Sequence, residues 1–197
     1  MKIGVVGLGL MGGSAAMAYK AAGHIVYGLD TDSTILGYAK LSGVIDDVLY
    51  PERYPDCDLI ILAATPKAMV GYLAENASKI PSSVLVMDFC GVKKDICRAG
   101  FEAAARYGFT YVGGHPMAGL QYSGFKHARA SLFKGASMII VPPVYDDMAL
   151  HFAYTVISSR LFLISVILSP LKSLVSYHPS NASPSFVGYS SPTVSPL

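Results

Sequence analysis

The sequence predicts an α/β fold, a doubly wound and mostly parallel sheet, over residues 1–147 of the 197. Two observations predict it. Short runs rich in Val, Ile and Leu recur along this stretch, and such runs are typical of strands buried on both faces. Helical patterns separate the runs, so successive strands are expected to be joined by right-handed crossovers and to lie parallel.

The elements follow one another in regular alternation. Strands are expected at residues 2–7, 24–29, 58–63, 83–89, 109–112 and 136–141, and helices at 11–22, at 33–42, after Pro66 and at 94–107. Gly23 stands where a glycine commonly ends a helix. Ser33 is expected to cap the second helix, and Pro66 suits the first turn of the third.

The composition divides the chain at Asp147. All 13 acidic residues lie in residues 1–147, so 148–197 contain none, although a protein surface normally mixes both signs of charge. The second stretch is apolar and then rich in Ser and Pro, so we expect it to be a poorly ordered, aberrant tail that replaces a further domain. Its apolar run, 149–168, contains Arg160 near its middle, where a charge is costly in a bilayer. We therefore expect no membrane segment.

Charge and cysteine content exclude several function classes. The net charge is +2 and only 14% of residues are charged, so a nucleic-acid partner has no electrostatic support. The three cysteines, Cys57, Cys90 and Cys97, lack a CxxC spacing. Neither a metal site nor a disulfide framework is expected, and a reducing, cytoplasmic location is favoured.

A glycine-rich turn joins the first expected strand to the first expected helix. Gly7, Gly9, Leu10, Met11 and Gly12 belong to a GxGxxG motif in this turn. In this context the motif is typical of a Rossmann-type dinucleotide-binding fold, whose glycines allow the tight turn, the close approach of a pyrophosphate and close helix packing. The start of the helix favours an anion.

Asp30 ends the second expected strand, where a ribose-binding carboxylate belongs. It would accept hydrogen bonds from ribose hydroxyls and repel a 2′-phosphate, and Asp32 adds negative charge, so NAD is favoured over NADP. The alternative is that Asp30 is only a turn or capping acid. Thr65 would contact the cofactor at the sheet edge or cap the helix that starts at Pro66.

Two further motifs follow later strands: DFCGVK at residues 88–93 and GGHPMAG at 113–119. Together with GLGLMGGS near the start, they resemble the prephenate and arogenate dehydrogenases. The resemblance implies NAD-dependent oxidative decarboxylation of prephenate or arogenate, in tyrosine biosynthesis. It also implies that His115 accepts the proton of the ring hydroxyl, and an imidazole with an ordinary pKa of about 6.5 suits that role. Without the flanking motif, His115 would be read as a loop histidine bonded to the backbone.

The chain departs from this family at several positions. Gly91 stands where many members carry a serine that helps to orient the histidine, and Cys90 could supply a weak donor or be a buried structural thiol. Lys93 is expected to cap the following helix or to pair with Asp88, and a direct contact with substrate is the less favoured alternative. Gln121 occupies a position where an acid is common.

The resemblance ends near residue 147. In the family a helical second domain supplies an arginine for the substrate carboxylate and most of the dimer interface, and residues 148–197 do not resemble it. We therefore expect cofactor binding with little or no turnover. One alternative is a β-hydroxyacid or 6-phosphogluconate type of dehydrogenase, which shares the glycine motif but not GHPMAG. Another is a non-catalytic NAD-binding module.

Overall fold

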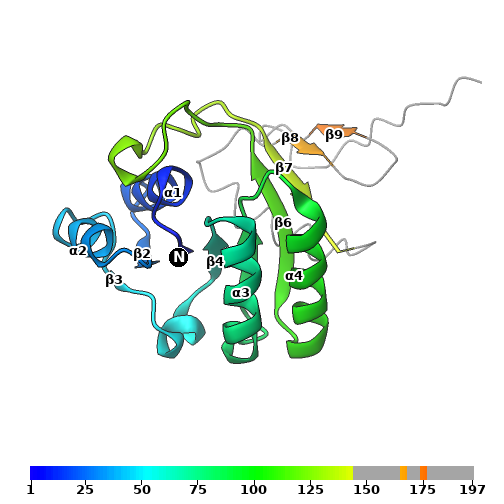
Figure 1. The fold of residues 1–197 in the computed structure, drawn as a ribbon. Helices are drawn as coiled ribbons and strands as arrows, with labels where there is room; N and C mark the ends of the chain where they lie inside the picture. Colours follow the sequence, from blue (N-terminus) through cyan, green and yellow to red (C-terminus); the bar gives the residue numbers. More distant parts are fainter. Residues whose placement is uncertain (144–164, 168–173, 177–197) are drawn as a thin grey trace, which may run out of the picture.

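The computed structural model describes residues 1–143, 165–167 and 174–176 (Figure 1). Seven strands form one sheet in the order β3-β2-β1-β4-β5-β6-β7. The strands are β1 Lys2–Val6, β2 Ile25–Leu29, β3 Asp47–Val48, β4 Leu59–Leu62, β5 Leu85–Asp88, β6 Thr110–Pro116 and β7 Met138–Val141. The helices are α1 Leu10–Ala21, α2 Ser33–Leu41, α3 Pro66–Asn76 and α4 Lys93–Tyr107, with short 3-10 turns η1 Pro51–Asp56, η2 Ala77–Lys79 and η3 Phe125–His127. A separate antiparallel pair joins β8 Ser165–Ile167 to β9 Leu174–Ser176.

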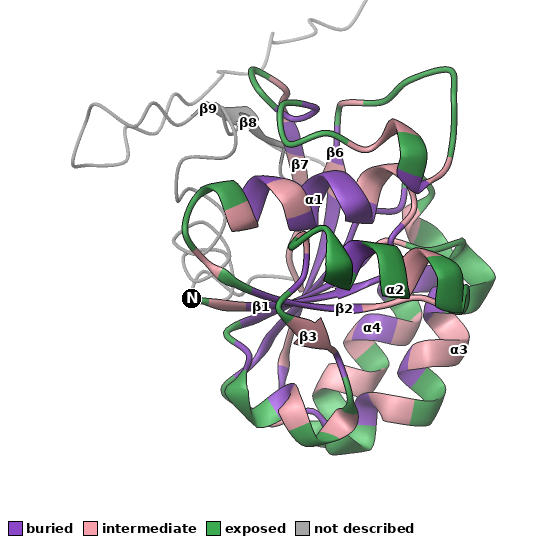
Figure 2. Cartoon of the chain, turned by 90° about the vertical axis from the view of Figure 1, so that its left-hand side faces the viewer, coloured by how far each residue is buried: buried purple, intermediate pink, exposed green. Residues whose placement is uncertain are grey.

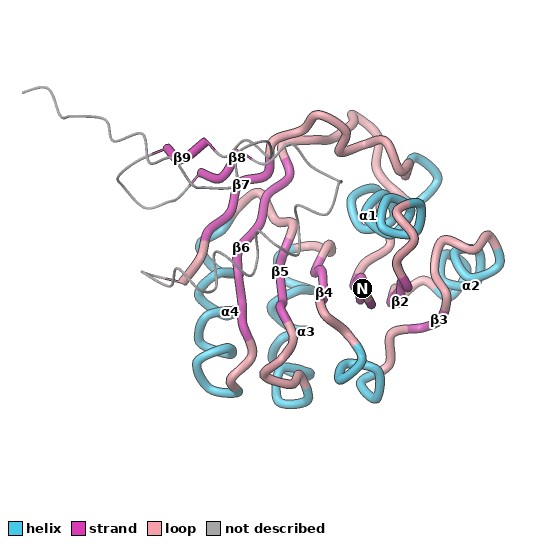
Figure 3. Tube along the Cα trace, turned by 180° about the vertical axis from the view of Figure 1, so that it is seen from behind, coloured by secondary structure: helices cyan, strands magenta, loops and turns pink. Residues whose placement is uncertain are grey.

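The sheet is parallel except for its last strand, which confirms the predicted fold class. β1 pairs in parallel with both β2 and β4, so the order of strands reverses between β1 and β4. In sheets of this kind ligands bind outside the carboxyl ends of the strands at that reversal. Figure 3 shows β4, β5, β6 and β7 side by side on the other half of the sheet.

Helices cover both faces of the sheet (Figures 1 and 2). One core cluster packs residues of α1 and α2 against one face, and the other packs α3 and α4 against the opposite face. Successive residues of β4 belong to the two clusters in turn, and all four are buried. This explains why the strands lack an alternating polar pattern: both faces need apolar side chains.

The last part of β6 differs from the prediction. A strand was expected to end at Val112, but β6 continues through His115 to Pro116. The reason is a partner distant in sequence: β7 runs antiparallel to this extension and places Ile139 opposite His115. The histidine is therefore held in a strand rather than in a loop.

Local signals at the helix ends were mostly predictive. Gly23 has the positive φ of a helix-ending glycine, and α3 begins at Pro66. The expected cap at Ser33 is wrong, because Asp32 caps α2 and accepts hydrogen bonds from the N–H groups of Thr34 at 2.8 Å and Ile35 at 3.3 Å. The carboxylate one residue earlier is the better acceptor for these free amides. The two-residue strand β3 was not predicted, since it is too short to show a period.

Most of the tail lies outside the described residues, as does the boundary expected at Asp147. The same holds for the apolar run at 149–168, apart from the short strand β8. Among the helices that the structure describes, none has the length and apolar character needed to cross a membrane.

Helix α1 approaches the end of β1 with no space for a side chain between them. A Cβ atom at Gly12 would lie 1.8 Å from the carbonyl oxygen of Gly7 and 3.0 Å from the Cβ of Ala63. Gly7 itself has a φ of 88°, which a residue with a side chain rarely adopts. Both glycines are therefore required by the backbone path of the turn.

This contact predicts opposite effects for two substitutions of helical glycines. Gly12→Ala is expected to lower the free energy of unfolding by about 3 kcal/mol or more, at the upper end for overpacking. Gly37→Ala in α2, where a Cβ would meet nothing within 4 Å, is the matched control. It should be neutral or raise stability by up to about 1 kcal/mol. Urea denaturation measures both, and equal stabilities would contradict the close approach.

Candidate functional site

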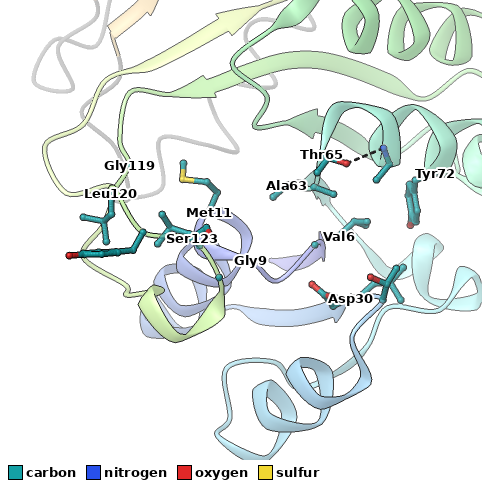
Figure 4. A pocket seen from close by; sticks show the side chains of 18 of the residues that line it. Val6, Gly9, Met11, Asp30, Ala63, Thr65, Tyr72, Gly119, Leu120 and Ser123 are labelled. Carbon is teal, nitrogen blue, oxygen red and sulfur yellow. Dashed lines mark hydrogen bonds between the residues drawn. The ribbon is translucent and has the colours of Figure 1, made fainter.

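A cavity of about 810 Å³ lies at the carboxyl ends of β1, β2 and β4, at the reversal of strand order (Figure 4). Its volume is typical of a site for a small organic ligand. The residues that the sequence assigned to a cofactor meet here, with one exception. Those that line the cavity are Gly7, Gly9, Leu10, Met11, Asp30 and Thr65. Gly12 does not line it, because it lies behind the turn against Gly7.

The start of α1 forms an open cradle in this cavity. Gly9 is the N-cap residue of α1, no side chain caps its free amides, and a Cβ at Gly9 would meet nothing within 4 Å. The first N–H groups of a helix lack partners within the helix. Together with the helix dipole they favour an anion, and the space at Gly9 lets it approach the backbone.

Asp30 lies beside this cradle in a fixed orientation. One carboxylate oxygen accepts a hydrogen bond from the N–H of Leu8 at 2.6 Å, and the other accepts from the N–H of Asp32 at 2.9 Å. An ionised carboxylate has about four acceptor sites. Asp30 can therefore hold the glycine turn in place and still accept hydrogen bonds from hydroxyls of a ligand.

Thr65 combines the two roles between which the sequence could not decide. Its Oγ1 accepts a hydrogen bond from the N–H of Ala68 at 3.4 Å and so caps α3. It also lines the cavity, and Figure 4 shows it on the wall formed by the start of α3. The capping role is part of the structure, and a contact with a ligand is compatible with it.

Sequence reasoning singled out Gly119 and Gln121 but did not predict that their segment covers one end of the cavity. Residues 119–124, between β6 and η3, line the cavity near Met11 (Figure 4). The chain that follows is fixed on α1: Ser14 Oγ accepts a hydrogen bond from the N–H of Arg129 at 3.0 Å, and Gly13 leaves room for Phe125. The small pair Gly13-Ser14 inside a predicted helix was the available signal, since such residues allow another segment to approach closely.

His115 lies on the same edge of the sheet as the cradle but does not line the cavity. β1, β4, β5 and β6 are successive neighbours, so three strand spacings, about 14 Å, separate the ends of β1 and β6. The loop after β5 approaches the histidine: a Cβ at Gly91 would lie 3.4 Å from Cε1 and 3.8 Å from Nδ1 of His115.

The surroundings of His115 favour the neutral form of its imidazole. Burial lowers the pKa of the imidazole below its ordinary value, the positive charge of Lys93 lowers it further, and Asp88 partly offsets these effects. Its Nδ1 is buried and has no hydrogen-bond partner among the residues that the structure describes. A neutral imidazole can accept a proton, but an unpaired Nδ1 does little to stabilise the charged product.

A buried carboxylate, Asp88, organises the strand ends around His115. It is fully buried and pairs with Lys93, which also donates to the carbonyl oxygen of Gly114. It further accepts hydrogen bonds from the Tyr111 hydroxyl at 2.7 Å and the Cys90 N–H at 2.8 Å. The predicted pair of Lys93 with Asp88 is confirmed, whereas Tyr111 was not anticipated.

Cys90 does not replace a serine hydroxyl beside the histidine. Its thiol donates to the carbonyl oxygen of Val92 at 3.2 Å, and the residue is buried. The interpretation as a structural thiol is therefore correct, and Cys57 and Cys97 are likewise buried and free. Within residues 1–143 and the two short strands beyond, no cluster of His, Cys, Asp or Glu could hold a metal ion.

Comparison with known proteins identifies the family that this chain resembles. The sequence model described as "Prephenate dehydrogenase, nucleotide-binding domain" matches residues 15–160. The chain is 34% identical to the prephenate dehydrogenase of Bacillus subtilis (strain 168) over 150 residues, which is 73% of this chain and 40% of that protein. The family match begins inside α1, so the geometry of the glycine turn supports a nucleotide site independently.

Solved structures give the same result. The crystal structure of Synechocystis arogenate dehydrogenase has a TM-score of 0.75 and 26% identity, over 85% of this chain and 60% of that one. The prephenate dehydrogenase from A. aeolicus, in complex with hydroxyphenyl propionate and NAD+, has a TM-score of 0.69 and 25% identity, over 86% and 59%. The chain spans less than two thirds of each of these relatives. With three quarters of its length in the family match, this chain belongs to the family of prephenate dehydrogenase nucleotide-binding domains.

Proposed function

We propose that this chain binds NAD in the cavity and forms the cofactor half of a dehydrogenase that oxidatively decarboxylates prephenate or arogenate, a step of tyrosine biosynthesis. The observation that carries the proposal is the shared sheet edge of the glycine cradle and His115. The ends of β1 and β6 are about 14 Å apart across three strand spacings, and this span suits a ligand that extends from a pyrophosphate to a reacting ring. The A. aeolicus relative was solved with NAD+ and a hydroxyphenyl acid.

The described residues fit the cofactor. The start of α1 would hold the pyrophosphate, Asp30 would accept hydrogen bonds from a ribose, and the cavity has room for both. Bound NAD would supply the acceptor for a hydride. The chain contributes position and electrostatics, which are the main requirements when aromatisation drives the loss of CO2.

His115 would act as the general base. The ring hydroxyl would lose its proton to the imidazole while a hydride leaves the ring carbon that bears this hydroxyl. The electron pair released with CO2 would then move through the ring to the oxygen of the former hydroxyl. This oxygen takes up a proton and becomes the phenol. Because Nδ1 is buried, Nε2 is the nitrogen proposed to accept the first proton. The lowered pKa favours the unprotonated imidazole, which is the form that can accept this proton.

The other options carry less support. A β-hydroxyacid or 6-phosphogluconate type of dehydrogenase is disfavoured by the family match. A non-catalytic NAD-binding module is favoured by one feature, the unpaired Nδ1 of His115, and is an outcome of the experiments below. A cytoplasmic location and dimerisation through a further domain remain predictions from the sequence.

The first prediction concerns cofactor choice. NAD is expected to bind about tenfold or more tightly than NADP, because a like-charge contact between Asp30 and a 2′-phosphate at about 4 Å costs roughly 1–4 kcal/mol. Asp30→Asn should weaken the binding of NAD and reduce the preference for NAD over NADP. Calorimetric titration of the purified chain measures both affinities.

Asp58→Asn is the matched control for that experiment. Asp58 also accepts a hydrogen bond from a backbone N–H, that of Lys2 at 2.7 Å, but at the opposite end of β1. This variant should bind both nucleotides as the parent chain does. A chain that binds no NAD would refute the proposed function, and equal effects of the two variants would refute the role of Asp30.

The second prediction tests the unpaired Nδ1 of His115. Gly91→Ser is expected to place a hydroxyl next to Nδ1, since a Cβ there lies 3.8 Å from it without a clash. Gly91→Ala adds the same carbon without the hydroxyl. A serine hydroxyl that accepts a hydrogen bond from the N–H at Nδ1 favours the charged imidazole. The pKa of His115 should therefore be about 0.5–1 higher in the serine variant than in the alanine variant. NMR titration of His115 in the two variants measures this difference, and identical titration curves would exclude a hydrogen bond between the serine hydroxyl and Nδ1.

The third prediction concerns turnover. A substrate with two carboxylates needs cationic partners, because an unpaired buried anion is costly. In the described part of the chain, Lys93 is the cation next to His115, and it is already paired with Asp88. We therefore expect prephenate- or arogenate-dependent NADH formation by the chain alone to stay at background in an absorbance assay. Robust NADH formation would show that the chain holds the carboxylates itself.

A further inference from the structure

One wall of the cavity is a segment that depends on its two ends for its position. We call residues 119–124 the cover; all six line the cavity, they belong to no helix or strand, and all but Gly124 are exposed. Among the described residues, no backbone hydrogen bond holds residues 118–123. The end toward β6 is fixed by the N–H of Met117, which donates to the carbonyl oxygen of Ser137 at 2.7 Å.

The other end of the cover leads into η3, which is docked on α1. Figure 1 shows the yellow-green turn of η3 beside that helix. A Cβ atom at Gly13 would lie 2.8 Å from Cδ2 of Phe125 and 3.0 Å from the Cβ of Ala128. Phe125 is buried, and its ring meets the ring of Tyr38 of α2 edge to face at 5.8 Å. The turn therefore packs directly on the backbone of α1.

A buried hydroxyl fixes this docking. Ser14 and Asp88 are the two fully buried polar side chains in the part of the chain that the structure describes. The Oγ of Ser14 accepts a hydrogen bond at 3.0 Å from the N–H of Arg129, a residue 115 positions later. Alanine is a better helix former than serine, so α1 itself does not require the hydroxyl. Its contribution is the contact with the connection between β6 and β7.

A ring contact links the docked turn to the cover. The rings of Tyr122 and His127 are stacked, with centroids 5.1 Å apart and an angle of 22° between their planes. Tyr122 belongs to the cover and lines the cavity, whereas His127 is the last residue of η3. The position of η3 on α1 therefore sets the position of the cover.

Helix α1 thus carries two parts of the site. Gly9 at its start belongs to the cradle, and Ser14 follows five residues later, about 7.5 Å along the helix axis. Figure 4 shows Met11 and Leu120 toward one end of the cavity, Gly9 between, and Asp30 toward the other end. A ligand with a ribose at Asp30 and phosphates at the cradle would therefore meet the cover with the part beyond its phosphates.

We propose that Ser14 is a positioning residue for the dinucleotide: through the amide of Arg129 it docks η3 on α1 and holds the cover against the half of NAD that lies beyond the pyrophosphate. The inference rests on the proposed NAD site. Removing the hydroxyl should loosen the cover and weaken ligands that reach it, and it should spare ligands that end at the cradle.

The first measurement is the binding of NAD and AMP to the full chain by calorimetry. Ser14→Ala is expected to weaken NAD about 3- to 10-fold, because the loss of one hydrogen bond lowers the docked population and the apparent affinity falls with it. AMP ends at its phosphate, so its affinity should not change. Ser42→Ala is the matched control: its hydroxyl donates to the carbonyl oxygen of Tyr38 at 2.7 Å at the end of α2 and does not line the cavity.

The second measurement is limited proteolysis, which reports the docking itself. Trypsin cleaves after Lys126 and Arg129, which are exposed, and the rate follows the population in which this turn has left α1. Ser14→Ala should speed cleavage at these two sites, and cleavage after Arg106 near the end of α4 is the internal control. NAD should slow cleavage of the parent chain and AMP should not, because a ligand stabilises the state that it contacts.

The outcomes separate this inference from the proposed function. A parent chain that binds no NAD refutes the proposed function, and the proteolysis of the two chains without ligand then still tests Ser14: equal rates overturn its role. If the parent binds NAD and Ser14→Ala binds it equally well, or if AMP affinity falls in parallel, the positioning role is refuted while the NAD site stands. Ser14→Cys keeps the side-chain volume with a weaker acceptor and gives the same test should the alanine variant not fold.

Discussion

The nucleotide half of this protein depends on one close contact, the approach of α1 to the end of β1 at Gly7 and Gly12. Because a Cβ at Gly12 would lie 1.8 Å from the Gly7 carbonyl oxygen, the helix can start directly at the sheet edge only with glycine there. That start leaves free amides facing the cavity. Asp30 then fixes the turn through the N–H of Leu8. Moving the helix outward would remove the cradle and the carboxylate's partner together.

The half that carries His115 depends on a different interaction, the buried charge of Asp88. Its partners Lys93, Tyr111 and the Cys90 amide come from α4, β6 and the loop between β5 and α4. Lys93 also donates to Gly114, next to the histidine. Losing one partner of such a buried pair costs about 3–5 kcal/mol, so the network sets both the position and the electrostatic environment of His115.

The nucleotide-binding side of the sheet edge and the side that carries His115 differ in how many of their polar groups have partners. The cradle and Asp30 line one cavity, and the hydrogen bond from the Leu8 N–H to the Asp30 carboxylate holds them together. His115 has a lowered pKa and an Nδ1 without a partner in the described part of the chain, with Gly91 opposite it. The described residues therefore suit the binding of a nucleotide better than the transfer of a proton. Nucleotide binding and turnover are for this reason expected to be separable properties of the chain.

The sequence by itself determined the features that depend on neighbours along the chain. The alternation of strands and helices, the glycine turn, Asp30 at a strand end and the start of α3 at Pro66 are all local patterns. Tertiary structure decided what depends on distant partners. β6 extends to His115 because β7 pairs with it, and Tyr111 reaches Asp88 because Gly100 of α4 leaves space for its ring. Tyr72 faces the cavity with Tyr54 behind it. Sequence periods record which face is buried, but they do not record which side chain fills the space opposite.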